Sequence, residues 1–290
     1  MPTKISEKFN IAMQPNKHRY LLIPGIVCLL AVFSPSCEKS VDFPIDPQYP
    51  TTLYRLGTND YIHSLVSYFM RNPDVITALT WFGFCGYSGG YEKEYYFPPK
   101  NGYTSRAEAI ALAKEFIARN PKQTGINDTS AVRFDYTDQD WGYDSTCFWF
   151  LRTPNQFVNS MEVLNSMVGF RISNGRLIEC IGNWYPEIYV PGTFNISTDK
   201  ALQNLVGREC GLWGWGGYEP NKVKQSDLKD AEISRVVYPV TDGSYEELES
   251  QTKTELRVAY KINLPTAFYI FYIDVMDGRL ISSGPTVISK

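Results

Sequence analysis

Histidine is almost absent from this chain, whose 290 residues include two, His18 and His63. Ser-His and Cys-His nucleophiles and many zinc sites need a histidine beside other specific groups, and the sequence contains no HExxH motif. His63 lies next to the apolar Ile62 and near Leu65 in a predicted helix, so we interpret it as a partly buried residue without a catalytic role. These scarcities predict a protein that is not an enzyme and needs no cofactor.

Clusters of basic residues are missing as well. The chain has 28 Lys and Arg against 31 Asp and Glu, a formal net charge of -3. Because binding to a phosphate backbone requires a basic footprint, we expect no nucleic-acid partner. A hydrophobic share of 43% with 20% charged residues is typical of a globular protein. The aromatic share of 14% favours β-sheet or an aromatic binding surface.

No apolar run reaches the length that a membrane-spanning helix usually needs. The run at residues 20–33 counts about fourteen residues, where a spanning helix needs about 20. Basic residues precede this run, and Ser34 and Ser36 follow it before Cys37. The order of basic, apolar and small residues indicates an export signal. A transmembrane anchor is the alternative, which the short length disfavours.

The small residues that lead into Cys37 resemble the lipobox of bacterial lipoproteins, in which that cysteine is lipidated. The resemblance implies that residues 1–36 are a signal peptide and that lipid on Cys37 is the link to the membrane. Glu38 stands where the familiar inner-membrane retention signal has Asp, so we expect an outer-membrane location, on either the periplasmic or the cell-surface face. Acyl chains contribute about 0.8 kcal/mol per buried methylene, and several of them anchor a protein without a spanning helix.

Four cysteines remain beyond the signal peptide and the lipidation site: Cys85, Cys147, Cys180 and Cys210. None has the CxxC spacing of a redox or zinc motif. In an exported chain they can form disulfides in several connectivities. Buried free thiols are the alternative, and the sequence leaves both open.

The chain after Cys37 divides by composition. Residues 37–56 are proline-rich and suit a tether. Residues 57–103 form an N-terminal segment that begins with a helix and continues into an aromatic and glycine-rich stretch, for which a hairpin turning at Gly89-Gly90 is predicted. The helix has apolar residues at helical spacing, which are Ile62, Leu65, Val66 and Phe69.

Two later stretches, residues 168–181 and 271–284, share the sequence Gly-Arg-Leu-Ile. Each predicts a strand, a two-residue Asn-Gly or Asp-Gly turn, and a return strand. One face of each first strand is apolar, which predicts the core positions Val168, Phe170 and Ile172 in one copy and Phe271, Ile273 and Val275 in the other. A constant apolar face with a variable outer face is typical of a repeated structural unit.

A predicted helix precedes each set of strands. Ser105 and Glu108 form a capping-box pattern at the start of the first helix, and Ser197 or Thr198 caps the second. The sequence therefore predicts an α+β fold with two repeated units, residues 104–190 and 191–290, each a helix packed on an antiparallel sheet.

The second unit resembles the PepSY family and the related propeptide domains of thermolysin-like and fungalysin-like proteases. The resemblance is carried by Thr198 with Ala201, by Ala259-Tyr260-Lys261, and by the run from Tyr272 to Leu280. Residues 168–183 and the following Trp-Tyr-Pro match the propeptide type more loosely. Members of these families inhibit or assist peptidases or bind other proteins, so the resemblance implies a protein partner, with an exported peptidase as the expected one.

Glycine-spaced aromatic residues suggest a second hypothesis, a surface glycan-binding lipoprotein. Trp213, Trp215 and Tyr218 can form a flat platform for a sugar ring or an apolar peptide side chain. The alternative is that they pack into the core, as large aromatic side chains usually do.

Charged residues supply the remaining candidates. Asp138, Asp140 and Asp144 alternate as calcium ligands sometimes do, but the EF-hand order is not met, so a solvated acidic loop is favoured. Arg171 and Asp274 occupy the outer faces of the two matching strands and are candidates for a binding surface. For Asp274, a polar contact in the turn or across strands explains the residue better than catalysis.

Overall fold

The computed structural model describes residues 49–73, 75, 78–86, 104–141, 147–173, 175–214, 217–242 and 250–286. For residues 136–141, 147, 212–214, 217 and 218 it describes the backbone alone. The fold is α+β, as the sequence predicts, and all of these residues belong to one compact unit, residues 39–286. The predictions for Cys37, Gly89-Gly90, Asp144 and Trp215 lie outside the described residues.

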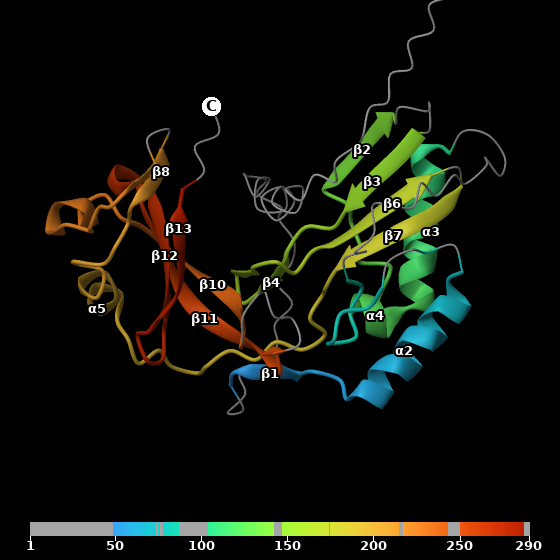
Figure 1. The fold of residues 1–290 in the computed structure, drawn as a ribbon, viewed down its shortest axis with the longest axis horizontal. Coiled ribbons are helices and arrows are strands. Elements are labelled where there is room, and N and C mark those ends of the chain that lie inside the picture. The colour runs from blue at the N-terminus through green and yellow to red at the C-terminus, as the bar shows by residue number, and fades with distance from the viewer. Residues whose placement is uncertain are drawn as a thin grey trace, which may run out of the picture. The chain divides into compact units, whose positions relative to one another are not determined.

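The first sheet has four antiparallel strands in the order β2-β3-β6-β7. Their bounds are Tyr136–Trp141, Cys147–Arg152, Val168–Ser173 and Arg176–Gly182. Helix α3, Arg106–Arg119, packs on this sheet against β3 and β7 (Figure 1). The capping box predicted for this helix is confirmed, since Ser105 Oγ accepts from Glu108 N and Glu108 Oε2 accepts from Ser105 N.

The β6–β7 hairpin agrees with its sequence pattern. Val168, Phe170 and Ile172 are all buried, which confirms the predicted core face. Ser173 pairs with Arg176, so the turn between them has the two residues predicted, and Gly175 adopts a φ of 73° there.

The acidic stretch near residue 140 is part of this sheet. Asp138 and Asp140 lie within β2, where they pair with Phe150 and Phe148 of β3. The prediction of an acidic loop is therefore wrong for these two residues, because the backbone from Tyr136 to Trp141 pairs with β3 as an antiparallel ladder.

The second sheet has seven strands, with the order β13-β12-β11-β10-β5-β4 and β1 paired to β11. The longer strands are β10, Glu232–Thr241, and β11, Lys253–Leu264. Around them lie β1, Thr51–Tyr54; β4, Gln156–Val158; β5, Met161–Val163; β12, Tyr269–Asp274; and β13, Leu280–Pro285.

Helix α5, Thr198–Gln203, packs on β11, and Ser197 caps it by accepting from Lys200 N (Figure 1). The core between helix and sheet contains the alternating apolar residues of β11, which are Leu256, Val258, Tyr260 and Ile262. Phe271, Ile273 and Val275 are fully buried in the same core, so the apolar face predicted for the second copy is confirmed as well.

Two of the seven strands come from the middle of the chain. The stretch from Phe157 to Leu164 turns back at Asn159 and Ser160, whose φ values are 47° and 61°. The resulting β4–β5 hairpin pairs in parallel with β10, through Glu162 opposite Val236. The sheet of residues 191–290 thus includes strands from residues 51–54 and 156–163.

Smaller elements complete the fold. Helix α2 spans Thr58–Arg71 and the short helix α4 spans Pro121–Thr124. Strands β8, Leu212–Gly214, and β9, Gly217–Glu219, form a separate two-stranded ribbon. Two 3-10 turns occupy Gln225–Leu228 and Pro265–Ala267. No helix in the described ranges combines the length and the apolar content that crossing a bilayer requires.

Candidate functional site

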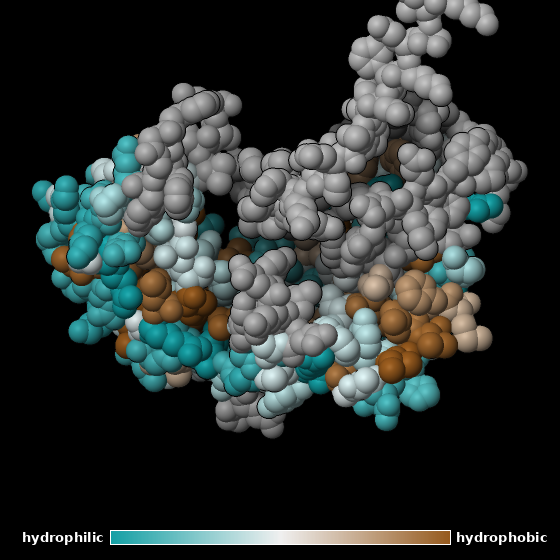
Figure 2. Space-filling model, viewed as in Figure 1, coloured by the Kyte–Doolittle hydropathy of each residue, from teal (hydrophilic) through white to brown (hydrophobic). Residues whose placement is uncertain are grey.

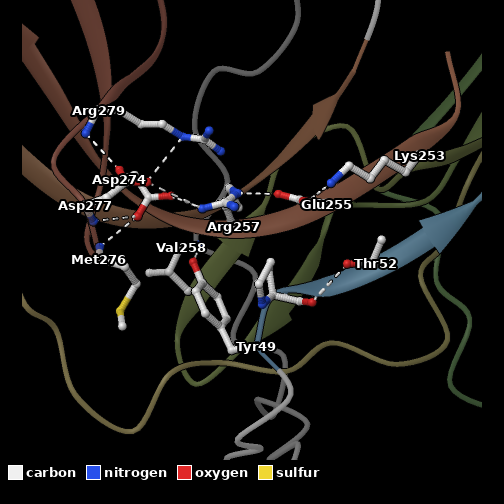
Figure 3. Close-up of polar contacts among 11 residues, drawn as sticks. Tyr49, Thr52, Lys253, Glu255, Arg257, Val258, Asp274, Met276, Asp277 and Arg279 are labelled. Atoms are coloured by element: carbon white, nitrogen blue, oxygen red, sulfur yellow. Dashed lines mark hydrogen bonds and ion pairs between the residues drawn. The ribbon is translucent and has the colours of Figure 1, made fainter.

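Two strands follow one another along a single edge of β11. The β1 pairing extends to Thr51 opposite Leu256, and the β12 pairing ends with Asp274 opposite Ala259. Val258 lies at the seam between these strands, where neither one continues the ladder. The seam brings together the charged residues drawn in Figure 3.

The backbone at the seam is satisfied by groups from both sides. The Val258 N–H donates to Tyr49 Oη at 2.8 Å, and the Val258 carbonyl accepts from Val275 N at 3.2 Å. Burial raises the pKa of Tyr49 to about 12, and the negative charge of Asp274 adds to the shift. Tyr49 is therefore a neutral phenol that fills the gap between the two strands (Figure 3).

Asp274 is the central residue of the seam and is fully buried. Its Oδ2 accepts from Arg257 Nη1 at 2.9 Å, and its Oδ1 accepts from Met276 N at 2.7 Å and from Asp277 N at 3.4 Å (Figure 3). Burying a carboxylate is costly unless it is paired and hydrogen-bonded, and both conditions are met here.

The same carboxylate explains why the second hairpin differs from the first. The last strand pair before its turn is Ile273 with Leu280, so the connection is longer than the two residues predicted, and that prediction is wrong. The Asp274 side chain accepts from Met276 N and Asp277 N, and its backbone carbonyl accepts from Gly278 N at 3.0 Å. Side-chain acceptance of this kind replaces the strand ladder with a local turn.

A row of alternating charges continues from Asp274 along β11. Lys253, Glu255 and Arg257 are two residues apart and share one face of the strand. Glu255 accepts from Lys253 Nζ and from Arg257 Nε, each at 2.6 Å. The hydrogen bond from Lys253 lowers the pKa of Glu255, the one from Arg257 adds to it, and burial opposes both.

The chemistry of this row is structural. Each carboxylate within it is paired with a cation, and a general base must instead be free to take a proton from a substrate. The seam therefore fastens β1 and β12 to β11, and Asp274 presents no carboxylate oxygen on the surface. The burial of Asp274 does not support its assignment to a binding surface. The polar contact that the sequence predicts for Asp274 is present.

Arg171, the counterpart of Asp274 in the first sheet, is also held within the chain. Its side chain is 27% exposed, and Nη1 lies 3.6 Å from Glu179 Oε2 on the neighbouring strand. The guanidinium carbon lies 4.8 Å from the ring centroid of Phe148. These contacts leave part of the side chain accessible, so Arg171 stays a candidate surface residue of modest exposure.

The aromatic and acidic candidates are placed by their backbone. Trp213 and Tyr218 are directly opposed in the β8–β9 ribbon, and Trp215 lies outside the described residues.

Among the residues that the structure describes, no three His, Cys, Asp or Glu side chains gather as a metal site would require. Cys85, Cys180 and Cys210 are buried thiols that are not joined in a disulfide, and the Cys147 side chain is not described.

The clearest exposed apolar surface lies on helix α2. Ile62, Val66, Phe69 and Met70 of α2 are 49%, 52%, 37% and 80% exposed. We call these four residues the α2 apolar face. They produce the brown patch over α2 in Figure 2.

Helix α2 has a second apolar face, and this one packs into the protein. It consists of Tyr61, Leu65 and Tyr68, which lie against the core beneath α3. Tyr68 and Phe116 pack edge to face, with ring planes at 90° and ring centroids 6.2 Å apart. Only Leu65 of the predicted stripe is on the packed side, and His63 is exposed rather than partly buried.

A scan against protein-family models finds no match to this chain, and a search of curated proteins finds none. A search of solved structures finds a likeness to the Bacillus megaterium YpeB C-terminal domain. The sequences are 10% identical, the alignment covers 80% of this chain and 98% of that chain, and the TM-score is 0.27. At this identity and TM-score the likeness defines no family for the chain.

Proposed function

We propose that this chain is a non-enzymatic, lipid-anchored envelope protein that binds a partner protein through the α2 apolar face. An exported peptidase is the partner class that the sequence resemblance suggests, and binding would restrain or assist it. The observation that carries the proposal is the exposure of four apolar side chains on one side of α2.

The exposed side chains are suited to a protein interface. They lie at positions 62, 66, 69 and 70, the spacing that places residues on one side of a helix. Full burial of such a side chain contributes about 1.5–3 kcal/mol. Contiguous exposed apolar patches on soluble proteins often mark sites of interaction with another protein.

A protein fits this face better than a membrane surface does. Helices that lie in the membrane interface are rich in Lys and Arg on their polar side. The charged residues of α2 are Asp60 in its first turn and Arg71 in its last, which gives no net positive charge. We therefore assign the face to an apolar groove or patch on another protein.

The proposal includes two PepSY-like units. Support comes from the order of elements, since α3 precedes the antiparallel order β2-β3-β6-β7 and α5 precedes β10-β11-β12-β13. Gly175 and Gly278, which align in the two matching stretches, have φ values of 73° and 72°. The longer turn at Asp274 is the main local difference between the two hairpins.

Site-specific crosslinking tests the proposed surface. A photoreactive residue at position 66 in the full chain should crosslink an envelope protein, and the same residue at position 206 should not. Val206 is a matched control, because it is exposed and apolar, at 43%, and lies outside α2. The double variant Val66→Ser and Met70→Ser should lose the partner, while Val206→Ser keeps it.

Two results would argue against this surface. Equal capture by the α2 double variant and by wild type would remove α2 from the interface. Loss of binding only in Trp213→Ala, together with binding to a glycan panel, would favour the glycan hypothesis instead. Identification of the crosslinked protein by mass spectrometry then shows whether it is a peptidase.

A further inference from the structure

Cys85 and Cys180 are brought together by backbone contacts from distant parts of the chain. The Cys85 carbonyl accepts from Gly182 N, at 3.2 Å, just beyond Cys180 on β7. The Cys85 N–H donates to the Gln123 carbonyl at 2.9 Å. Cys85 is thereby fixed on both sides, next to the end of β7.

The two thiols lie together in the core of the first sheet. Cys85 is 1% exposed and Cys180 is 0% exposed, and both belong to the same cluster of buried side chains. Cys85 Sγ lies 3.8 Å from Tyr68 Oη. Burial raises the pKa of the Cys180 thiol, and a hydrogen bond with the Cys85 side chain adds to the shift.

The strand register excludes a bond between Cys147 and Cys180. Cys180 pairs with Phe170, which pairs with Leu151, so Cys180 is level with Leu151 on β3. Cys147 is four residues away along β3, roughly 13 Å at the rise of a strand. Disulfide formation needs Cα atoms within about 7 Å.

Cys210 has different neighbours. It is buried in the core of the second sheet, among residues such as Leu205 and Val223. Cys85 and Cys180 contribute to the core of the first sheet. The contacts therefore select one pairing from those that the sequence leaves open.

We propose that Cys85 and Cys180 form a disulfide under oxidising conditions and that Cys210 stays a thiol. One thiolate attacks a sulfur of a disulfide oxidant, such as oxidised glutathione, forms a mixed disulfide and releases one glutathione thiolate. The second protein thiolate then attacks the mixed disulfide at the protein sulfur and releases the second glutathione. The protein loses two protons and two electrons, and the oxidant takes up the electrons as two thiols.

The burial of both thiols determines the stage of folding at which the disulfide can form. An oxidant cannot reach thiols that are 1% and 0% exposed in the folded chain. The bond therefore forms while the core around Tyr68 is still open, or during transient opening. Once formed, it is protected from reductants until the core opens again.

Disulfide mapping of the full chain tests the proposal. The chain is unfolded and reduced in detergent, refolded with reduced and oxidised glutathione, and trapped with an alkylating reagent. After digestion, the expected result is a peptide pair linking Cys85 to Cys180, with the Cys210 peptide alkylated. Refolding Cys210→Ser should yield the same linked pair.

The stability readout separates the bond from the packing of the side chains. Reduction should lower the midpoint of thermal unfolding in wild type and in Cys210→Ser. It should leave the midpoint unchanged in the double variant Cys85→Ala and Cys180→Ala. Recovery of Cys85 and Cys180 as alkylated thiols, or of a bond to Cys147 or Cys210, would overturn the proposal.

Discussion

Asn72 and Asn120 form a reciprocal pair of amide hydrogen bonds in the protein interior. Asn72 Nδ2 donates to Asn120 Oδ1 at 3.0 Å, and Asn120 Nδ2 donates to Asn72 Oδ1 at 3.1 Å. Each residue is the C-cap of its helix, α2 or α3. Each amide also donates to a carbonyl of its own last turn, Tyr68 or Phe116, so the pair joins two helix ends that need hydrogen-bond partners.

Replacing Asn120 with Ala should destabilise the fold strongly. The substitution removes the amide bonded to Phe116 O and leaves the Asn72 amide, 4% exposed, without its partner. Each buried polar group left unsatisfied costs about 1–3 kcal/mol, so we expect a loss of a few kcal/mol in the free energy of unfolding. Urea denaturation of the variant measures this loss.

The double variant Asn72→Ala and Asn120→Ala provides the control for the pair. It should lose less stability than the sum of the losses in the two single variants. Each single variant leaves the amide of the remaining asparagine without its partner, whereas the double variant removes both amides. Strict additivity in this double-mutant cycle would show that the two amides do not interact.

Asp274→Ala should be far more damaging than a change at its neighbour Asp277. Removing the buried carboxylate leaves Arg257, 16% exposed, with Glu255 as its remaining close partner, and it leaves Met276 N without its acceptor. Breaking a buried pair from one side costs about 3–5 kcal/mol. Asp277 is 50% exposed, so Asp277→Ala should cost less than about 1 kcal/mol. Equal effects in thermal unfolding would contradict the structural role of Asp274.

Gly125→Ala and Gly207→Ala compare two glycines with similar backbone conformation but different surroundings. Their φ values are 75° and 82°, so both alanines are strained by about 1–2 kcal/mol. A Cβ at Gly125 would lie 1.6 Å from the Trp184 carbonyl oxygen, whereas a Cβ at Gly207 meets nothing within 4 Å. We expect Gly125→Ala to prevent folding and Gly207→Ala to fold with a modest loss, as circular dichroism would show.

Alkaline pH should weaken the seam at Tyr49. Its pKa is about 12 in the fold against 10.0 for an ordinary tyrosine. The folded state holds the Tyr49 proton more tightly than the unfolded state does, and this stabilises the folded protein. The stabilisation is fully present below pH 10.0 and is lost as the pH rises toward about 12. Stability should therefore fall over this range in wild type.

Tyr49→Phe is the matched variant for that titration. It removes the ionisable group and the Oη that accepts from Val258 N, so it should lose about 1–3 kcal/mol at neutral pH. Its stability should then decline less steeply above pH 10.0 than that of wild type. Identical alkaline profiles would assign the decline to other tyrosines.

Local patterns in the sequence predict local structure well. The Ser105 and Glu108 pattern gives the observed capping box, because both partners lie within one turn of helix. Alternating apolar residues identify the buried face of β6 and of β11, since a strand alternates its side chains whatever its neighbours are. These features depend on spacing of only a few residues.

Features that depend on distant partners are not encoded in such spacing. Asp277-Gly278 has the composition of a two-residue turn, but Asp274 reorganises the connection through its buried carboxylate. Ile62 and Leu65 are similarly apolar, and only the packing of Tyr68 on Phe116 decides which side of α2 faces inward. Helical spacing of apolar residues therefore predicts the helix but not which of its sides is exposed, and an excess of apolar residues around that helix is the one available signal of the α2 apolar face.

The pairing of β1 with β11 constrains the order in which the protein is completed. Thr51 meets Leu256, about two hundred residues later in the chain, and such distant contacts form slowly. A chain that emerges from its N-terminus has made β1 and α2 long before β11 exists to receive the strand. The backbone groups of residues 51–54 therefore stay unpaired until β11 is present. We therefore expect assembly of the second sheet to be the late step of folding, and truncation within β11 to leave the N-terminal strand undocked.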